Sequence, residues 1–211
     1  MSYPNFIEEK RLWQRGFKYV VGLDEAGRGP LAGPVVAAAV FVKPNSRVLK
    51  GINDSKRLSK RQREFFYKVL INHPQIKWGI GVVSEKMIDK INILEATKLA
   101  MKKALRQAQG KLKKKIDFLI LDGNFSIDSA CLPVGRQKSI VKGDQKVFSC
   151  AAASIIAKVK RDELMQKYDK KHPEYGFAKH KGYPTKAHFA SLQKHGPCKI
   201  HRKTFYPVCE L

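Results

Sequence analysis

The stretch YVVGLDEAGRGPLAGPVVAAAVFV, residues 19–42, places two adjacent acids, Asp24 and Glu25, between two apolar runs. β-Branched and aromatic side chains predict a strand at 19–23 and a second strand at 34–42. A buried strand that leads into two carboxylates is unusual, because an unpaired buried charge costs several kcal/mol unless a cation or hydrogen bonds compensate it. The pair therefore indicates a metal ion.

Neighbouring side chains on a straight strand point to opposite faces of the sheet. We therefore expect the backbone to bend at Asp24 and Glu25, so that both can share a ligand. Gly27 and Gly29 allow backbone conformations closed to other residues, and they let a ligand approach the main chain. Taken alone, the two acids fit a hairpin turn with solvated carboxylates equally well.

Length and composition favour one domain, or one domain with a small appended subdomain, because 211 residues with 43% apolar content can form a sizeable core. The 42 Lys and Arg against 18 Asp and Glu give a net charge of +24. Such a charge repels itself unless the partner is a polyanion, so nucleic acid is the expected partner. A basic enzyme without that partner is the alternative.

The cysteines show neither CxxC pairs nor zinc-finger spacing, which predicts free thiols in a reducing cytoplasm. The first ten residues include acids and lysines rather than a signal-peptide core, and no apolar run approaches eighteen residues. We expect a cytoplasmic protein that is neither exported nor membrane-spanning. The four cysteines are Cys131, Cys150, Cys198 and Cys209.

Two further acids follow apolar segments later in the chain. The segment 117–122 has an apolar centre typical of a parallel strand covered on both faces, and Asp122 ends it. Asp144 follows a short apolar strand within 139–144. Ligands gather at the carboxyl ends of such strands, so these acids are expected beside the first pair, although Asp122 could simply end its strand. Asp162 lies well inside a helix beside an arginine, and local ion pairing explains it.

Capping residues and glycines mark the other elements. The first three strands are expected to form an antiparallel meander, with later strands added in parallel through crossover helices. We predict helices at 5–15, 59–72, 84–108, 148–168 and 185–196, a third strand at 77–84, and a loop at 125–137, with Phe6 and Leu12 facing inward.

Two basic segments stand out. Residues 101–115 carry seven Lys or Arg and no acid, which is typical of a solvated face and also compatible with phosphate contact. Residues 158–203 hold thirteen Lys or Arg against four Asp or Glu, so this quarter contributes about +9. Aromatic rings and histidines are interleaved with those charges. This pattern predicts a nucleic-acid-binding flap near the C-terminal end.

Five motifs together resemble the bacterial ribonuclease HII family, the type 2 ribonucleases H. They are DEAGRGPLAGPV, NDSK at 53–56, LILDGN at 119–124, VKGD at 141–144 and AAASIIAKVKRD at 151–162. The resemblance spans residues 19 to about 207. It implies a ribonuclease H-like α/β fold, a mixed sheet flanked by helices, with a catalytic core at 1–170 and a helical, substrate-binding C-terminal extension at 171–211.

The resemblance also implies an activity. The family hydrolyses the RNA-containing strand of RNA/DNA hybrids and nicks duplex DNA 5′ of single ribonucleotides, leaving a 3′-hydroxyl and a 5′-phosphate. Ribonucleotide removal and RNA primer removal are the implied roles, for a monomer without a membrane partner. Two Mg²⁺ or Mn²⁺ ions roughly 4 Å apart would be held by four acids, one ion activating water and one stabilising the leaving oxygen. The implied catalytic and metal-binding acids are Asp24, Glu25, Asp122 and Asp144.

Substrate contacts are implied in the same way. The backbone of the GRG motif is expected to read the 2′-hydroxyl, and Tyr183 to stack on the following deoxyribose. Core packing is the alternative for Tyr183, and a plain turn is the alternative for the NDSK motif. The implied substrate-binding residues are Gly27, Arg28, Gly29, Asp54, Ser55, Lys56, Lys142 and Tyr183.

Two other classes of protein compete with this interpretation: a nucleic-acid-binding protein without catalysis, and a related nuclease such as ribonuclease HIII or a resolvase. A ribosomal or chromatin-like binding protein explains the charge but not four ordered acids. Ribonuclease HIII carries an N-terminal substrate-binding domain, for which the twenty-three residues before Asp24 are too few. The other related nuclease, a resolvase that cuts only DNA, would not need the GRG motif at 27–29 or the KGYPT motif at 181–185.

Overall fold

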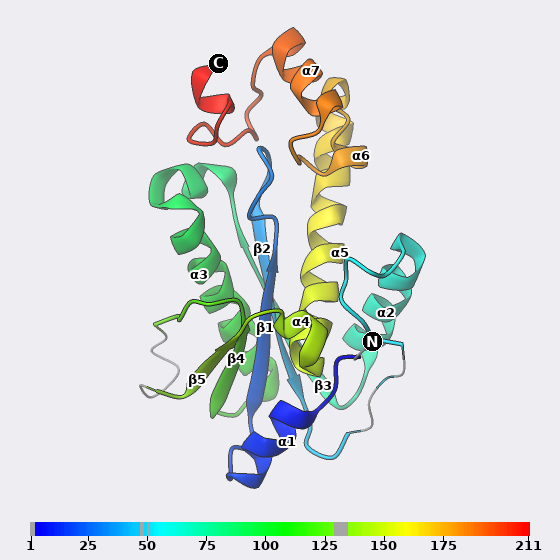
Figure 1. The fold of residues 1–211 in the computed structure, drawn as a ribbon, viewed down its shortest axis with the longest axis vertical. Coiled ribbons are helices and arrows are strands. Elements are labelled where there is room, and N and C mark those ends of the chain that lie inside the picture. Colours follow the sequence, from blue (N-terminus) through cyan, green and yellow to red (C-terminus); the bar gives the residue numbers. More distant parts are fainter. Residues whose placement is uncertain (1–2, 47–48, 50, 129–134) are drawn as a thin grey trace.

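The fold is a mixed five-stranded sheet between helices, seen in a computed structural model that describes residues 3–46, 49, 51–128 and 135–211 (Figure 1). The strand order is β3-β2-β1-β4-β5. The first three strands form the predicted antiparallel meander, and the last two run parallel to β1. The strands are β1 (Val20–Ala26), β2 (Val35–Val42), β3 (Ile76–Val83), β4 (Phe118–Asp122) and β5 (Gln137–Ile140).

Helices cover both faces of this sheet. The longest two, α3 and α5, lie on opposite sides, so the core consists of two apolar layers (Figure 1). The α-helices are α1 (Ile7–Gln14), α2 (Lys60–Asn72), α3 (Glu85–Leu112), α4 (Gly143–Lys146), α5 (Phe148–Lys171), α6 (Phe177–His180) and α7 (Lys186–His195). Two 3₁₀ turns, η1 (Pro173–Tyr175) and η2 (Val208–Glu210), complete the C-terminal part.

The predicted helix caps are largely confirmed. Ser59 and Gln62 form a reciprocal capping box at the start of α2. The Thr185 hydroxyl accepts a hydrogen bond from the His188 amide at the start of α7. Ser84 precedes α3 as expected, but its side chain makes no capping hydrogen bond.

The bend predicted at the two acids is wrong. β1 continues past the predicted end at residue 23, and its ladder with β2 pairs Asp24 with Ala38 and Glu25 with Ala37. The turn begins only at Gly27, where φ is +99°. The ladder with β2 and the hydrogen bond from the Glu25 amide to the Asp24 carboxylate keep this part of β1 extended, so no bend is needed there.

Three other boundaries differ from the prediction. α3 runs through Gly110 to Leu112, and a non-helical φ of 63° at Asn92 kinks it. The strand expected within 139–144 lies at Gln137–Ile140, and Asp144 belongs to α4 instead. The C-terminal extension has α6 and two 3₁₀ turns in addition to the predicted helix. Each missed element is short, and propensity specifies short elements poorly.

Small residues allow the helices to approach the sheet closely. A Cβ added at Gly81 of β3 would lie 1.9 Å from the Ala100 carbonyl oxygen of α3. On the other face, a Cβ at Gly22 of β1 would lie 2.5 Å from the backbone of Ser149 in α5. Contact at van der Waals distance along both helices fixes the position of the sheet that carries the acids.

The C-terminal extension packs on the end of α5 and on the turn between β1 and β2. Leu31 and Ala32 of that turn share a buried cluster with Met165 of α5, Phe177 and Leu192. Figure 1 shows α6, α7 and the C-terminal end together beyond the β1–β2 turn.

No helix in the described part of the chain is long and apolar enough to cross a membrane. Cys150, Cys198 and Cys209 carry free thiols, as predicted. The same prediction for Cys131 lies outside the described residues.

Gly81→Ala should destabilise the protein by about 1–3 kcal/mol, because the added methyl overlaps a helix backbone that cannot shift freely. Gly110→Ala is the matched control: a Cβ there meets nothing within 4 Å. In a helix interior that change should stabilise by about 0.5–1 kcal/mol. Urea denaturation of both variants measures the difference, and equal effects would contradict the packing described for α3 on β3.

Candidate active site

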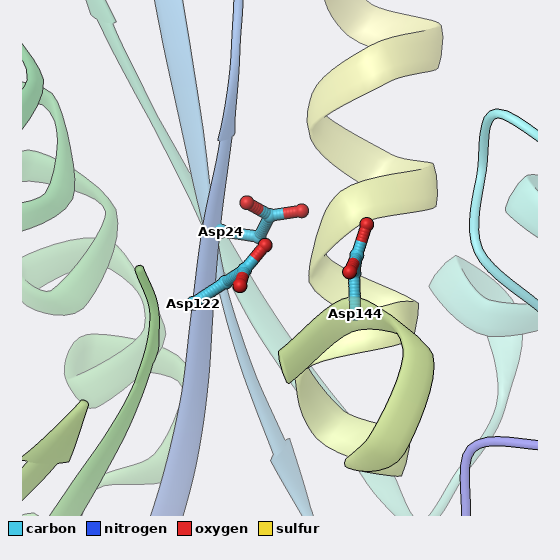
Figure 2. Close-up of side chains that lie close together, drawn as sticks. All are labelled: Asp24, Asp122 and Asp144. Atoms are coloured by element: carbon cyan, nitrogen blue, oxygen red, sulfur yellow. The ribbon is translucent and has the colours of Figure 1, made fainter. Parts of the chain in front are cut away.

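Three carboxylates from separate segments converge at the centre of the sheet (Figure 2). Asp24 lies on β1, Asp122 is the last residue of β4, and Asp144 lies on α4. One ligand oxygen from each lies within 4.8 Å of the others. β1 and β4 are parallel neighbours, so their later residues lie side by side, as predicted for strands that share one site.

Hydrogen bonds hold two of the three carboxylates in place. Asp24 accepts a hydrogen bond from the Glu25 amide at 2.7 Å. Asp122 accepts one from the Gly143 amide at 2.8 Å. Because Gly143 begins α4, this second bond joins β4 to α4 and brings Asp144, the next residue, toward Asp122.

Glu25 is placed differently from the other three acids. The β1 ladder is regular, so Glu25 does not share the side of the strand that Asp24 occupies. Its Oε1 accepts a hydrogen bond from Arg28 at 3.3 Å. Its carboxylate still borders the pocket that contains Asp24 and Asp122.

Burial and mutual repulsion disfavour the charged forms of these acids. Burial, Glu25 and Asp122 raise the pKa of Asp24 well above its ordinary value. The pKa of Glu25 is raised to about 7, mainly by burial, with Arg28 opposing. That of Asp144 is raised to about 6 by burial and by Asp122 and Asp54.

The site fits a hard divalent cation. Carboxylate oxygens are the ligands that Mg²⁺ and Mn²⁺ prefer, and three of them are within reach of one another. Within the described ranges, the buried Oε2 of Glu25 has no hydrogen-bond partner. A bound cation would remove the repulsion that raises these pKa values.

Asp24, Glu25 and Asp122 border a pocket of about 230 Å³. The GRG motif, Ser55, Lys56 and Tyr183, all predicted to touch substrate, line it. The Nζ of Lys56 lies 3.8 Å from Asp144. Burial lowers the pKa of Lys56, but Asp144 and Asp54 outweigh it and raise the value overall.

Two predicted contacts lie apart from that lining. Lys142 is exposed where α4 begins, with φ 58°. Asp54 is buried, and its carboxylate accepts hydrogen bonds from the Lys56 amide at 2.9 Å and from Gln145 at 3.1 Å. Asp54 therefore supports the turn before α2 and the helix that carries Asp144.

Ser154 and Lys158 of α5 also line the pocket, although the sequence did not single them out. The Ser154 hydroxyl lies 2.9 Å from that of Ser55. Lys158 forms an ion pair with Asp162 at 2.7 Å. Asp162 is thus ion-paired as expected, but with the lysine one turn earlier rather than with Arg161.

Two buried arginines anchor the turn that follows the acids. Arg202 donates to the carbonyl oxygens of Gly27, Arg28 and Gly33. Arg161 donates likewise to three carbonyls, each at 3.0–3.2 Å, and both guanidinium groups are fully buried. Sequence reasoning treated both as part of a basic, phosphate-binding surface. The carbonyls that Arg161 binds belong to Ala32, Pro34 and Lys181.

The family model described as Ribonuclease HII matches residues 21–208. The chain belongs to the ribonuclease HII family. It is 53% identical to the ribonuclease HII of Acetivibrio thermocellus over 199 residues, which are 94% of this chain and 74% of that protein. It is 50% identical to the ribonuclease HII of Chlamydia muridarum over 205 residues, 97% of this chain and 89% of the relative.

Solved structures agree with the fold. Ribonuclease H2 from Pyrococcus horikoshii superposes with a TM-score of 0.69 at 27% identity, covering 90% of this chain and 95% of that chain. Bst-RNase HIII in complex with Mn²⁺ superposes with a TM-score of 0.71 at 17% identity, covering 92% of this chain and 69% of that chain. At that identity the superposition shows a similar fold and nothing more. As a ribonuclease HII family member, the protein is a ribonuclease H, a hydrolase with nuclease activity, and not a non-catalytic nucleic-acid-binding protein.

The raised pKa of Glu25 predicts a pH-dependent loss of stability in metal-free protein. An unfolded glutamate ionises near its ordinary value of 4.5, but folded Glu25 ionises near 7. Ionisation of the Glu25 carboxyl therefore lowers the free energy of unfolding as the pH rises from about 4.5 to 7. In EDTA at pH 8, Glu25→Gln should be more stable than the parent by about 1–3 kcal/mol.

The advantage of Glu25→Gln should shrink toward pH 4.5, and excess Mg²⁺ at pH 8 should reduce it by stabilising the parent. Urea denaturation at both pH values measures this. Groups that do not interact with Glu25 titrate alike in both proteins and cancel in the difference, whereas Asp24, whose pKa Glu25 raises, is relieved in the variant and adds to its advantage. An advantage that does not change with pH would contradict the assigned repulsion.

Proposed function

We propose that this protein hydrolyses the RNA-containing strand of RNA/DNA hybrids and nicks duplex DNA on the 5′ side of a single embedded ribonucleotide. The products would carry a 3′-hydroxyl and a 5′-phosphate, and the roles would be removal of ribonucleotides and of RNA primers. One observation carries this proposal: Asp24 and Asp122 of the carboxylate cluster share a pocket with the GRG backbone and with Tyr183.

In this proposal the acids bind two divalent ions, Mg²⁺ or Mn²⁺. When bound, such ions activate a water molecule and stabilise the leaving oxygen of the phosphodiester. The Mn²⁺ complex of Bst-RNase HIII, which has a similar fold, supports the choice of metal. The metal-binding residues proposed are Asp24, Glu25, Asp122 and Asp144.

The GRG motif offers backbone donors to the substrate. Arg202 binds the carbonyl oxygens of Gly27 and Arg28. In a trans peptide the C=O and the following N–H point in opposite directions, so the amides of Arg28 and Gly29 point away from Arg202. Those two amides have no hydrogen-bond partner in the parts of the chain that the structure describes. They are suited to contact a 2′-hydroxyl or the adjacent phosphate.

Tyr183 is placed to meet the sugar next to the ribonucleotide. It is 41% exposed, which argues against a purely packing role. Its ring borders the acidic pocket and lies 3.9 Å from a Cβ built on Gly29. The Arg161 guanidinium lies 5.8 Å from the ring centroid. We assign Tyr183 to stacking on the following deoxyribose, where a second 2′-hydroxyl would disturb the contact.

The remaining assignments concern phosphates and assembly. Ser55, Lys56 and Lys142 would contact the nucleic-acid backbone, with Asp54 orienting their turn. The enzyme is proposed to act as a monomer. We propose a catalytic core at 1–170 and a substrate-binding extension at 171–211.

The decisive experiment uses three duplexes: all DNA, DNA with one ribonucleotide, and a continuous RNA/DNA hybrid. With Mg²⁺ or Mn²⁺, the protein should nick 5′ of the lone ribonucleotide, cut the hybrid and leave all-DNA intact. End-labelled products on a denaturing gel locate each cut. Equal cutting of all-DNA, or a requirement for four consecutive ribonucleotides, would refute the proposed specificity.

Asp24→Asn, Asp122→Asn and Asp144→Asn should each reduce turnover at least about 100-fold, because an amide is a poorer ligand for a hard cation and ligands act as a unit. Asp162→Asn is the control: it removes an ion pair with Lys158 and should stay within severalfold of the parent. Duplex binding should persist in all four variants. An inactive Asp162→Asn protein beside an active Asp144→Asn protein would show that Asp162, and not Asp144, is the fourth acid of the site.

A further inference from the structure

The C-terminal extension contains three packed histidines that the proposed reaction does not use. His188 and His201 are buried, with exposed fractions of 0% and 2%. The ring of His180 stacks on His188 with centroids 4.3 Å apart. A buried polar side chain without a hydrogen-bond partner is costly, so the partners of these rings are informative.

The hydrogen bonds of His188 and His201 fix a single direction of donation. The Cys198 amide donates to Nδ1 of His201 at 2.9 Å, so neutral His201 carries its proton on Nε2. That Nε2 lies 3.1 Å from Nε2 of His188. His188 must therefore accept there and carry its own proton on Nδ1. Nδ1 of His188 lies 3.0 Å from the carbonyl oxygen of Tyr183, which accepts it.

The two rings thus form a relay from the Cys198 amide to the Tyr183 carbonyl, with opposite tautomers in its two members. Both rings are neutral, since burial lowers the pKa of each to about 4. For His188 the hydrogen bond to Tyr183 opposes that shift, and for His201 the neighbouring His188 adds to it.

The relay ends on the segment that presents Tyr183 to the pocket. Gly182, just before it, has φ +81°, and a Cβ there would lie 2.6 Å from the Ala32 carbonyl oxygen. At the other end, His201 forms an antiparallel bridge with the same Ala32. The relay therefore joins the Tyr183 segment to the strand-like contact beside the β1–β2 turn, next to Arg202.

We propose that His188 and His201 are positioning residues that set where the Tyr183 ring stands relative to the carboxylates. The inference rests on the proposed role of Tyr183 at the sugar beside a lone ribonucleotide. The His188 hydrogen bond is the second bond to that carbonyl, after the Thr185 amide at 2.9 Å, and fixes the peptide plane that follows Tyr183.

Two substitutions at His188 separate its two hydrogen bonds. The amide of asparagine is two bonds from Cβ, as Nδ1 is, so His188→Asn keeps a donor for the Tyr183 carbonyl. The amide of glutamine is three bonds from Cβ, as Nε2 is, so His188→Gln keeps only the contact with His201. His188→Gln should lower kcat/KM at a lone ribonucleotide by roughly two- to tenfold, the worth of one hydrogen bond.

The kcat/KM of His188→Asn at a lone ribonucleotide should stay within about twofold of the parent value, because the hydrogen bond to Tyr183 is kept. Cutting of continuous RNA/DNA hybrid should change little in either variant, and Tyr183→Ala sets the largest loss expected. Equal losses for His188→Asn and His188→Gln, or equal losses on both substrates, would reduce His188 to packing and overturn the inference.

At His201 the pattern should reverse. His201→Gln keeps a donor at the position of Nε2 for His188, but His201→Asn keeps only the contact with the Cys198 amide. His201→Asn should therefore be the weaker enzyme on the lone ribonucleotide. The same order of Asn and Gln at both positions would overturn the relay.

The unaltered protein provides a test that does not depend on folding of variants or on activity. Nitrogen-15 spectra of the imidazoles should show His188 protonated at Nδ1 and His201 protonated at Nε2 at pH 7. An Nε2–H tautomer at His188 would overturn the inference. Failure of the parent to nick at a lone ribonucleotide would instead refute the proposed function, and the tautomers would be unaffected.

Discussion

Repulsion among buried carboxylates is the constraint on which this structure depends. Asp24, Asp122 and Asp144 place oxygens within 4.8 Å of one another, and burial makes their ionisation costly. Only a rigid frame can hold like charges that close. Two parallel strands provide two of the acids, and the Gly143 amide ties the short helix carrying the third to Asp122.

The frame achieves its rigidity by using small residues. Ala37, Ala38 and Ala39 fill the centre of β2 with no exposed surface, so both long helices lie close to the sheet. Gly81 lets the backbone of α3 approach further, and Gly22 does the same for α5. This close packing of helix backbones on the sheet resists the displacement that repelling acids would otherwise cause.

Sequence reasoning found most of this because the signals were local. Apolar runs ending in acids predicted the strands, and the parallel sheet rule predicted that Asp24 and Asp122 would meet. It failed where tertiary contacts decided the outcome. Glu25 was expected to turn toward Asp24, but the pairing partner of its strand kept it regular.

The buried arginines show the same limit. Arg161 and Arg202 lie in a segment rich in positive charge, so its composition suggested a nucleic-acid-binding surface. Their partners are carbonyl groups of a distant turn, which leave no trace in residue type. A turn with several glycines and prolines and few donors of its own is a weak sign that other residues must bind its carbonyls.

The hydrogen bond between Arg202 and the Arg28 carbonyl joins residues 174 positions apart. Arg202 follows every strand and α5 in the chain, so its hydrogen bonds to the turn can form only after those elements have been synthesised. The sheet and α5 can bring the acids together while the GRG turn still lacks its Arg202 anchor. During synthesis, then, a ribosome-bound chain contains all four acids before it contains the residue that binds the carbonyls of Gly27 and Arg28. The anchoring of this turn is completed only when residue 202 leaves the exit tunnel.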